Sequence, residues 1–467
     1  MNNLYKNLEW IKFYTFKNEP FYYFPDNMTL IESDENFGKL LTDLRDKEVT
    51  SIQENKYPEG YVEDVLYNME VLHNKGTMKK IIPSSLPDFI PLNKIIMANT
   101  LKCNLSCTYC YNKFDINSCP PEDMSEETFR KVTEFLEHNG PDLPFYKLYF
   151  IGGEPLANLH ILEEAGKWGE RLRKKGRDLF IAVTTNGTLI NKDIIDFCMK
   201  YRINLKLTVD GNEMEHNLHR IFPDGTGSYE KVRDMLPDYF YSYRNPSKYV
   251  ATTIDTLESD LEDRVIRLAA MGFNIIDLTE IYTNKKEETY KEEDLENIFR
   301  EKYRKVFEFL YLRVRSRNYL RIIPVYDTVK NIHFKKPSFS RCTAGLDSLS
   351  VAHDGTIYPC HHFYGDKRFA MGTVYEREIN PDKFKPYRIP VTERRECSVC
   401  WARLLCGGPC YHRSLAVTGD AFLCNKIECI RRKALIAEAF RFYIRLKNED
   451  TLSLKYFLNM DKYIRSL

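Results

Sequence analysis

Three cysteines lie close together in the string CNLSCTYC, at Cys103, Cys107 and Cys110. Three thiolates on one short loop can bind three irons of a [4Fe–4S] cluster and leave the fourth iron without a protein ligand. A zinc site would need a fourth ligand nearby and usually has paired Cys-x2-Cys units, which this loop lacks. A disulfide loop is the other alternative. The spacing predicts an iron–sulfur site with one open iron, at which a small molecule can bind and react.

A second group of cysteines lies near the C-terminal end. Residues 1–102 and 199–341 contain none, whereas residues 342–429 contain eight of the chain's thirteen cysteines. A cytosolic chain keeps its thiols reduced, so clustered cysteines indicate metal binding there rather than disulfides. We therefore expect two separate metal regions. The cysteines of the second region are Cys342, Cys360, Cys397, Cys400, Cys406, Cys410, Cys424 and Cys429.

The residues between these two regions alternate between strand-like and helix-like patterns. Runs of apolar and β-branched residues predict strands at 94–100, 146–151, 178–184, 204–209, 249–254 and 274–280. Helical patterns lie at 125–138, 159–174, 190–201, 228–237 and 258–271. Repeated strand–helix units predict an α/β fold with a parallel sheet that closes fully or partly into a barrel.

Polar and glycine-rich motifs follow the first four of these strands. The cysteine loop (residues 103–110) follows the first strand, and GGEP (152–155) follows the second. TTNG (184–187) follows the third, and Asp210-Gly211 follows the fourth. Active sites of such barrels gather at the C-terminal ends of the strands. We therefore expect all four motifs on one rim.

The Cys-x3-Cys-x2-Cys spacing, with an aromatic residue before the last cysteine, resembles the radical S-adenosylmethionine (SAM) enzymes. The GGEP string matches the second signature of that family. The resemblance implies a partial (β/α)6 barrel of the TIM type. It also implies that the open iron chelates the amino and carboxylate groups of SAM, and that an electron from the cluster cleaves SAM to methionine and a 5′-deoxyadenosyl radical.

The same resemblance implies a set of SAM contacts. The glycines of GGEP would let the backbone approach the methionyl group, Glu154 would bind its ammonium, and Arg220 would reach its carboxylate. Arg220 as an ordinary surface residue and Leu278 as plain core, rather than an adenine contact, are the alternatives. The residues expected to bind SAM are Tyr109, Gly152, Gly153, Glu154, Thr185, Asn186, Thr208, Arg220 and Leu278.

The C-terminal cysteines resemble the SPASM pattern, an extension of radical SAM enzymes that carries auxiliary iron–sulfur clusters. By resemblance, one auxiliary cluster is bound by Cys397, Cys400, Cys406 and Cys424. The other is bound by Cys342, Cys360 and Cys410. Some relatives have a further cysteine where this chain has Ser348, so the fourth iron there is open or is bound by Cys429 or another group. With the cysteine loop, this implies three [4Fe–4S] clusters; a zinc ribbon at Cys397 and Cys400 is the alternative.

The residues ahead of the barrel contain no cysteine and show a different pattern. Phe21–Phe24 and Met28–Ile31, joined by a turn, predict a β-hairpin, and helical segments are expected at 36–44 and 61–72. This order resembles the winged-helix module that binds leader peptides in enzymes acting on ribosomally made peptides; a packing extension is the alternative. A leader could add a strand to the hairpin edge.

These features divide the chain into four expected parts. They are a leader-peptide recognition module at 1–80, the radical SAM barrel at 90–320, the SPASM domain at 340–430 and C-terminal helices at 431–467.

The segment after Cys360 bears on the reaction. Sulfatase-maturating relatives have an aspartate base directly after this cysteine, whereas this chain has His361 and His362. The stretch 358–366 resembles the maturases that form thioethers (sactipeptide and ranthipeptide enzymes). The resemblance implies an oxidative reaction on a precursor peptide, with His361 or His362 as the proton acceptor, since imidazole titrates near neutrality. A structural role for these histidines is the alternative.

Other functions share the same iron motifs. A peptide epimerase, a carbon–carbon cross-linking maturase and a sulfatase-type maturase remain alternatives, and a non-catalytic iron–sulfur protein is a different class. A scaffold, however, has no use for GGEP or for a cluster with an open iron.

Composition bears on partners and location. The formal net charge of +1 gives no electrostatic reason to expect nucleic acid or an anionic membrane as partner. The sequence shows neither a signal peptide nor an apolar run that could span a bilayer. We expect a cytoplasmic enzyme with a precursor peptide as substrate and a flavodoxin or ferredoxin as electron donor.

Overall fold

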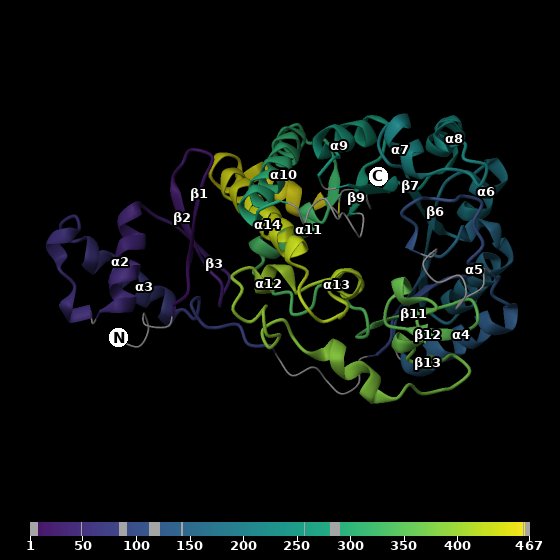
Figure 1. Cartoon of the computed structure of the whole chain (residues 1–467), viewed down its shortest axis with the longest axis horizontal. Coiled ribbons are helices and arrows are strands. Elements are labelled where there is room, and N and C mark those ends of the chain that lie inside the picture. The colour runs from purple at the N-terminus through teal and green to yellow at the C-terminus, as the bar shows by residue number, and fades with distance from the viewer. Residues whose placement is uncertain are drawn as a thin grey trace.

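The computed structural model describes residues 8–47, 49–83, 91–111, 122–141, 143–255, 257–280, 290–460 and 462. A small N-terminal module (residues 8–83) lies at one end of the molecule, and a curved sheet covered by helices forms the other (Figure 1). The cysteine-rich C-terminal segment adds strands to one end of the sheet, and its two short helices lie between the sheet and the N-terminal module (Figure 1).

One sheet of ten strands forms the centre of the described residues. Its order is β10-β9-β8-β7-β6-β5-β4-β11-β12-β13, parallel from β10 to β11 and antiparallel from β11 to β13. The strands are β4 (Lys94–Met97), β5 (Phe145–Phe150), β6 (Asp178–Thr185), β7 (Ile203–Thr208), β8 (Tyr249–Ile254), β9 (Ile275–Glu280), β10 (Arg321–Ile323), β11 (Ser348–Val351), β12 (Thr356–Tyr358) and β13 (Gly372–Thr373).

The predicted α/β fold with a parallel, partly closed sheet is confirmed. The six predicted strands correspond to β4–β9, and β10 and β13 stand at the two ends of the sheet. Two parallel neighbours were not predicted. β10 follows β9, and β11 pairs with the other side of β4, with Ser348 opposite Lys94. Both strands are short, so they show no periodic pattern of their own.

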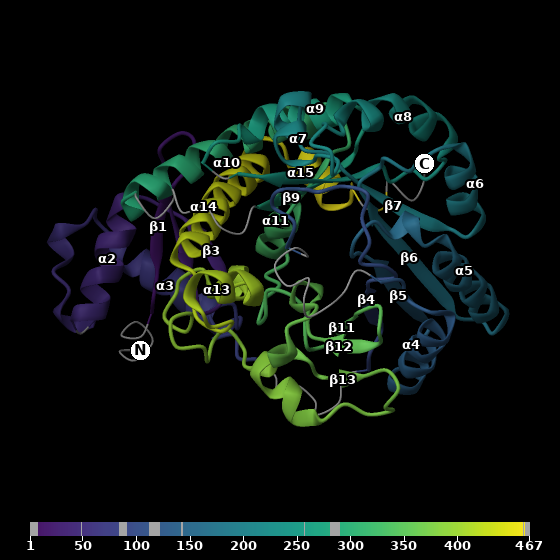
Figure 2. The same cartoon turned by 45° about the vertical axis from the view of Figure 1, so that its right-hand side comes forward.

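Helices cover the outer face of the curved sheet (Figure 2). Their starts follow the capping rule, because Ser125, Asn191 and Asp260 each accept a hydrogen bond from a backbone N–H of the first helical turn. The barrel helices are α4 (Glu126–Asn139), α5 (Leu159–Lys174), α6 (Lys192–Lys200), α7 (Glu213–His219), α8 (Tyr229–Ser242), α9 (Leu261–Ala270), α10 (Glu292–Arg315) and α11 (Val325–His333).

The C-terminal segment adds helices that pack against the barrel. The long α14 (Lys426–Glu449) runs along α10 and α11, and α15 (Thr451–Leu458) follows it. Two short helices, α12 (Arg403–Cys406) and α13 (Tyr411–Thr418), lie among the cysteines. Among the described residues, the helices include none with the length and apolar character needed to cross a bilayer.

The N-terminal module has a three-stranded antiparallel sheet and two helices. The predicted hairpin is confirmed as β2 (Pro20–Phe24) and β3 (Thr29–Glu32), and the predicted helices as α2 (Glu35–Asp46) and α3 (Tyr61–Asn74). The strand β1 (Ile11–Tyr14), which pairs with β2, was not predicted.

Both faces of β2 are buried, which explains its run of aromatic residues. Tyr22 and Phe24 belong to the module's own core with α2. Phe21 and Tyr23 point the other way and pack on Phe440 of α14, whose ring lies 4.8 Å from that of Tyr23. Side chains alternate between the faces of a strand, so β2 joins the module's core to the main core.

We predict that Phe440→Ala destabilises the protein by about 3–5 kcal/mol, because it leaves a cavity where the rings of Phe21 and Tyr23 now pack. The midpoint of anaerobic urea unfolding measures the change. The matched control is Leu452→Ala on α15, whose side chain is 64% exposed and should change stability by less than about 0.5 kcal/mol. Equal midpoints for the two variants would contradict the packing role of Phe440.

Candidate functional site

A cavity of about 560 Å³ opens at the C-terminal ends of the barrel strands. We call it the barrel cavity. Loops after β4, β5 and β6 form one side, and inward-facing residues of β7, β8 and β9 form another. The sequence-predicted residues that line it are Cys103, Cys107, Tyr109, Cys110, Gly152, Gly153, Thr185, Asn186, Thr208, Arg220, His361 and His362.

The GGEP turn is fitted closely against the chain that leads into the cysteine loop. The Gly153 N–H donates to the Thr100 carbonyl at 3.0 Å, and the Glu154 N–H donates to the Lys102 carbonyl at 2.8 Å. A Cβ at Gly153 would lie 2.0 Å from the Lys102 carbonyl oxygen. Glycine at these positions therefore permits the close contact between the GGEP turn and the backbone directly before Cys103. It would also permit the close approach of a ligand.

The three thiols of the cysteine loop suit a bound cation. Cys103 lies within electrostatic range of Cys107 and Cys110, and weak solvation in the cavity raises the pKa of Cys103 to about 12. A thiol in such surroundings is inert unless a positive charge stabilises its thiolate. Three thiols on one wall of a cavity fit the donor set of an iron–sulfur cluster, whose irons supply that charge.

Glu154 links two loops rather than lining the cavity. Its carboxylate accepts hydrogen bonds from the backbone N–H of Asn186 at 2.8 Å and of Leu156 at 3.1 Å. Burial raises the pKa of Glu154 to about 6, although these hydrogen bonds oppose the shift. In this structure Glu154 holds the turn after β6, and its predicted contact with the SAM ammonium stays a prediction.

The turn after β6 in turn holds the cysteine loop. Asn186 Nδ2 donates to Asn104 Oδ1 at 2.9 Å and lies 3.9 Å from Cys103 Sγ. Thr208 Oγ1 donates to the Thr185 carbonyl at 3.0 Å. These contacts connect β7, the β6 turn and the cysteine loop into one hydrogen-bonded unit.

Arg220 is buried, so its interpretation as a surface arginine is wrong. Only 7% of the residue is exposed, and Nε donates to Asp210 Oδ2 at 2.8 Å. Asp210 also accepts hydrogen bonds from the Tyr109 hydroxyl and, at 2.7 Å, from the Thr253 N–H. Burial opposes the charge on Asp210, but Arg220 keeps the pKa of its carboxyl below the usual range. The pair places a fixed cation at the cavity wall.

Sequence reasoning missed a charged pair on the inner face of the barrel. Lys206 of β7 and Asp277 of β9 line the cavity, and Lys206 Nζ lies 2.6 Å from Asp277 Oδ2. Lys206 stands between Leu205 and Leu207 of its strand, so strand alternation could have placed it on the inner face.

Leu278 does not line the barrel cavity but lines a second cavity beside it, and its predicted contact with adenine stays a prediction. It is 6% exposed and belongs to the main core. Its neighbours Asp277 and Thr279 line the barrel cavity instead, because successive residues of a strand face opposite sides.

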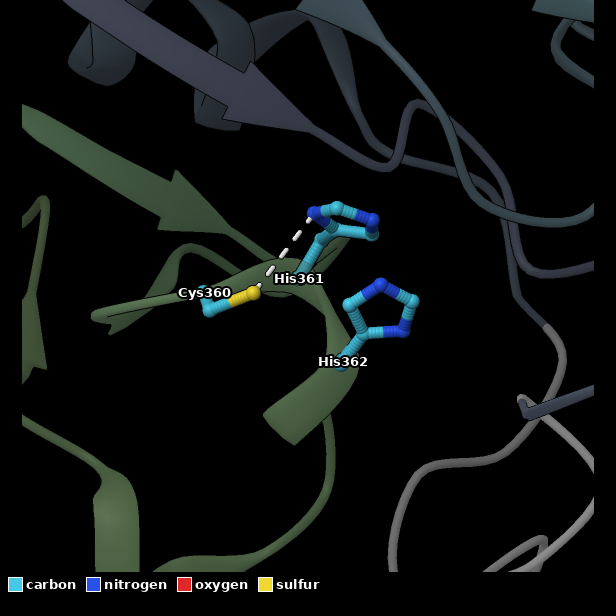
Figure 3. A group of neighbouring side chains, drawn as sticks. All are labelled: Cys360, His361 and His362. Carbon is cyan, nitrogen blue, oxygen red and sulfur yellow. Dashed lines mark hydrogen bonds between the residues drawn. The ribbon is translucent and has the colours of Figure 1, made fainter. Parts of the chain in front are cut away.

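The segment after Cys360 reaches the barrel cavity. Figure 3 shows the imidazoles of His361 and His362 next to the Cys360 sulfur, and His361 Nδ1 lies 3.8 Å from it. The three donor atoms lie within 4.8 Å of one another. The ring of Tyr111, from the end of the cysteine loop, lies 4.2 Å from that of His362. Burial lowers the pKa of His361 to about 3 and that of His362 well below its usual value, so both imidazoles are neutral.

The C-terminal cysteines, including Cys360, form two groups. A pocket of about 340 Å³, the cysteine pocket, is lined by Cys397, Cys400, Cys406, Cys424 and Cys429. Its Cys397 and Cys424 sulfurs lie 3.5 Å apart.

The second group contains Cys342, Cys360 and Cys410, which lie within electrostatic range of one another. Both predicted groupings are therefore brought together in space. Cys429, considered as a possible fourth ligand of the three-cysteine group, lies beside Cys424 in the cysteine pocket instead.

A partly closed parallel barrel, with one cysteine loop at its rim and a second cysteine-rich region beside it, defines an iron–sulfur enzyme of the α/β-barrel class. The family profile described as the radical SAM superfamily matches residues 100–240. The profile described as an iron–sulfur cluster-binding domain, SPASM, matches residues 342–401. The chain thus carries a radical SAM domain followed by a SPASM domain.

Known proteins with similar sequences include enzymes of the same kind. The cysteine-type anaerobic sulfatase-maturating enzyme of Clostridium perfringens is 24% identical over 344 residues, which cover 68% of this chain and 88% of that protein. The antilisterial bacteriocin subtilosin biosynthesis protein AlbA of Bacillus subtilis is 22% identical over 320 residues, which cover 67% of this chain and 64% of that protein.

A solved structure has the same fold. Native anSMEcpe with bound AdoMet and Cp18Cys peptide superposes with a TM-score of 0.61 at 22% identity and covers 77% of this chain and 99% of that one. The likeness to that structure supports the fold, and the two matched domains support SAM and iron–sulfur clusters as cofactors of this chain.

We predict that Gly153→Ala disrupts the cysteine loop, because the added Cβ would overlap the Lys102 carbonyl oxygen and push the loop from its place. After anaerobic reconstitution the variant should bind about four fewer irons per chain and lose SAM binding. The matched control is Gly169→Ala on α5, where the nearest atoms lie at 3.3 Å and belong to side chains. Full iron content in Gly153→Ala would show that the close backbone contact is dispensable.

Proposed function

We propose that this chain is a radical SAM peptide maturase that forms thioether cross-links from cysteine thiols of a ribosomally made precursor peptide. One observation carries the proposal: the cysteine loop and the residues directly after Cys360 line the same cavity. A substrate in this cavity would lie between the radical-generating site and an auxiliary site.

The cysteine groups fit three [4Fe–4S] clusters. The cysteine loop would bind the first, Cys342, Cys360 and Cys410 the second, and Cys397, Cys400, Cys406 and Cys424 the third. When bound, SAM and the clusters supply a 5′-deoxyadenosyl radical for hydrogen abstraction and sites that accept the electron left by an oxidative coupling.

Residues of the barrel cavity would bind and orient SAM. Arg220, held by Asp210, presents a permanent cation that suits the SAM carboxylate. Asn186 and Thr185 lie next to Cys103, where they could meet the carboxylate or the ribose. Tyr109, which donates to Asp210, fixes the end of the cysteine loop to the same unit.

His361 or His362 would take the proton of the substrate thiol. Burial keeps both imidazoles neutral, as a proton acceptor must be before the reaction, but their lowered pKa also makes them weak bases towards a thiol. Formation of a C–S bond removes one hydrogen from carbon and one from sulfur. The carbon hydrogen leaves as an atom and the thiol hydrogen as a proton, and one electron goes to the auxiliary site.

The space next to the barrel cavity suits a long substrate. A second cavity of about 700 Å³ is lined by Asp277, Thr279 and Glu280, which also line the barrel cavity. The two cavities therefore adjoin at the end of β9. An extended peptide could pass from one to the other, which a small-molecule substrate would not require.

The similar proteins support a peptide substrate. AlbA is by name a bacteriocin biosynthesis protein, the Clostridium perfringens enzyme is by name one that matures sulfatases, and anSMEcpe has been solved with a peptide. A flavodoxin or ferredoxin would supply the electron for SAM cleavage.

We predict that the product is a peptide lighter by two hydrogen atoms, in which one cysteine no longer reacts with iodoacetamide. The substrate is the peptide encoded by the short, cysteine-rich reading frame that we expect beside the gene. Mass spectrometry before and after alkylation gives the result. Unchanged mass with free thiols would indicate epimerisation, and loss of two hydrogens with all thiols free would indicate a link that does not involve sulfur.

Two sets of variants separate radical formation from cross-linking. Replacing Cys342, Cys360 and Cys410 with Ala should abolish the cross-link while 5′-deoxyadenosine still forms. Replacing the three cysteines of the cysteine loop should remove about four irons and all SAM cleavage. SAM cleavage that survives the second change would overturn the assignment of the cysteine loop.

The N-terminal module would bind the leader of the precursor peptide. Its three-stranded sheet has two edge strands, β1 and β3, and an extended peptide can add to such an edge through backbone hydrogen bonds. We therefore predict that a chain lacking residues 1–80 binds a fluorescein-labelled leader peptide at least about tenfold more weakly. Fluorescence anisotropy measures the affinity. Iron content and peptide-independent SAM cleavage are the controls for folding, and equal affinity of the two chains would count against the module as the leader site.

A further inference from the structure

Arg341 lies between the two groups of C-terminal cysteines. It directly precedes Cys342 of the three-cysteine group, and its side chain lines the cysteine pocket. Its guanidinium lies within electrostatic range of both Cys406 and Cys410. One cation is therefore shared by sulfurs that belong to different groups.

Arg341 is the partly exposed end of an otherwise buried chain of alternating charges. It forms an ion pair with Glu428 Oε1, which also lies 3.2 Å from Arg413 Nη1. Arg413 Nη1 lies 2.5 Å from Glu280 Oε2, and Glu280 Oε1 lies 3.2 Å from Arg431 Nε. This chain joins the loop before β11 to α14, α13 and the end of β9.

The chain of charges has a positive excess. Among the described residues it contains three guanidinium groups and two carboxylates; at least nine-tenths of Glu280, Arg413, Glu428 and Arg431 is buried, and the Arg341 side chain is 21% exposed. Buried charges are costly unless an opposite charge balances them. Thiolate-bound iron–sulfur clusters are anionic and become more negative on reduction. Clusters at the two cysteine groups would place negative charge beside Arg341.

Glu428 also contacts the cysteines directly. Its Oε2 accepts a hydrogen bond from the backbone N–H of Cys410 at 3.3 Å. A negative and a positive group therefore lie side by side at the boundary between the two cysteine groups. Removal of the Arg341 charge should lower the electrostatic potential at this boundary, and removal of the Glu428 charge should raise it.

We propose that Arg341 compensates the charge of both auxiliary clusters and raises their reduction potentials, with Glu428 acting in the opposite sense. The proposal rests on the auxiliary clusters of the proposed function. A nearby cation stabilises the reduced, more negative state of a cluster more than its oxidised state. Arg341 thus makes the auxiliary sites better electron acceptors, as an oxidative coupling requires.

The test is a redox titration of the auxiliary clusters, followed by electron paramagnetic resonance (EPR). The parent is the full chain with Cys103, Cys107 and Cys110 replaced by Ala, reconstituted anaerobically, so that only auxiliary signals remain. At the parent's midpoint, Arg341→Gln should lower the ratio of reduced to oxidised clusters about tenfold, a shift of about 59 mV for one electron. Glu428→Gln should raise the same ratio.

Two controls define the origin of the shift. Arg341→Lys keeps the charge and should stay much closer to the parent than Arg341→Gln. Arg300→Gln removes an arginine whose Nε lies 3.1 Å from the buried carboxylate of Glu438. Glu438 lies ten residues after Glu428 on α14, a distance of about 15 Å along the helix. This variant should leave the midpoints unchanged.

The outcomes separate this proposal from the proposed function. A parent without auxiliary iron and EPR signals would contradict the auxiliary clusters themselves. Clusters present in every chain with the same midpoint in Arg341→Gln as in the parent would overturn the role of Arg341. If Arg341→Gln loses iron, the Glu428→Gln variant is the deciding test. A reduction midpoint above that of the parent supports an electrostatic role for this pair of charges, and an unchanged or lower midpoint overturns it.

Discussion

The parallel pairing of β4 with β11 is the constraint on which the site depends. β4 leads into the cysteine loop, and β11 leads, through the β12 hairpin, to Cys360 and His361. The Tyr364 hydroxyl lies within hydrogen-bond distance of the Ile96 and Val351 carbonyls at 3.2 and 3.1 Å and so holds the two strands from the end of the segment. The chain leaves β4 and β11 at the same rim, since parallel neighbours run in the same direction, and the antiparallel β12 then brings it back beside β11 to Cys360. The cysteine loop and the pair His361 and His362, more than 200 residues apart in sequence, line one cavity.

The cysteine-rich region is held to the barrel by charges as well as by strands. Glu280, at the end of β9, is paired with Arg413 of α13 and Arg431 of α14. Burial opposes the charge on Glu280, but the two arginines keep the pKa of its carboxyl far below the usual value. Because removal of one partner from a buried pair is strongly unfavourable, such contacts fix the relative position of their elements more strictly than apolar packing does. The end of β9, whose residues line both cavities, is therefore held in place by these ion pairs.

Local sequence patterns predicted much of this fold, and tertiary pairing explains the rest. The strands β4–β9 were found because each is a run of apolar and β-branched residues, and a polar motif follows each of the first four. β1, β10 and β11 have only three or four residues and become strands through their neighbours. In the site, spacing identified the cysteine loop, but the pairing of Lys206 with Asp277 depends on β7 and β9 flanking β8, which no local pattern contains.

The charges around the barrel cavity occur in pairs, and this bears on what the cavity can bind. Arg220 is paired with Asp210, and Lys206 with Asp277, each by a contact shorter than 3 Å. The wall therefore presents fixed dipoles and little net charge. Methionine carries an ammonium and a carboxylate, and a peptide backbone carries amide dipoles without net charge, so both would find complementary groups there. A strongly anionic ligand would instead have to compete with Asp210 or Asp277 for the cations of the wall, so the wall suits a zwitterionic or neutral ligand better than a polyanionic one.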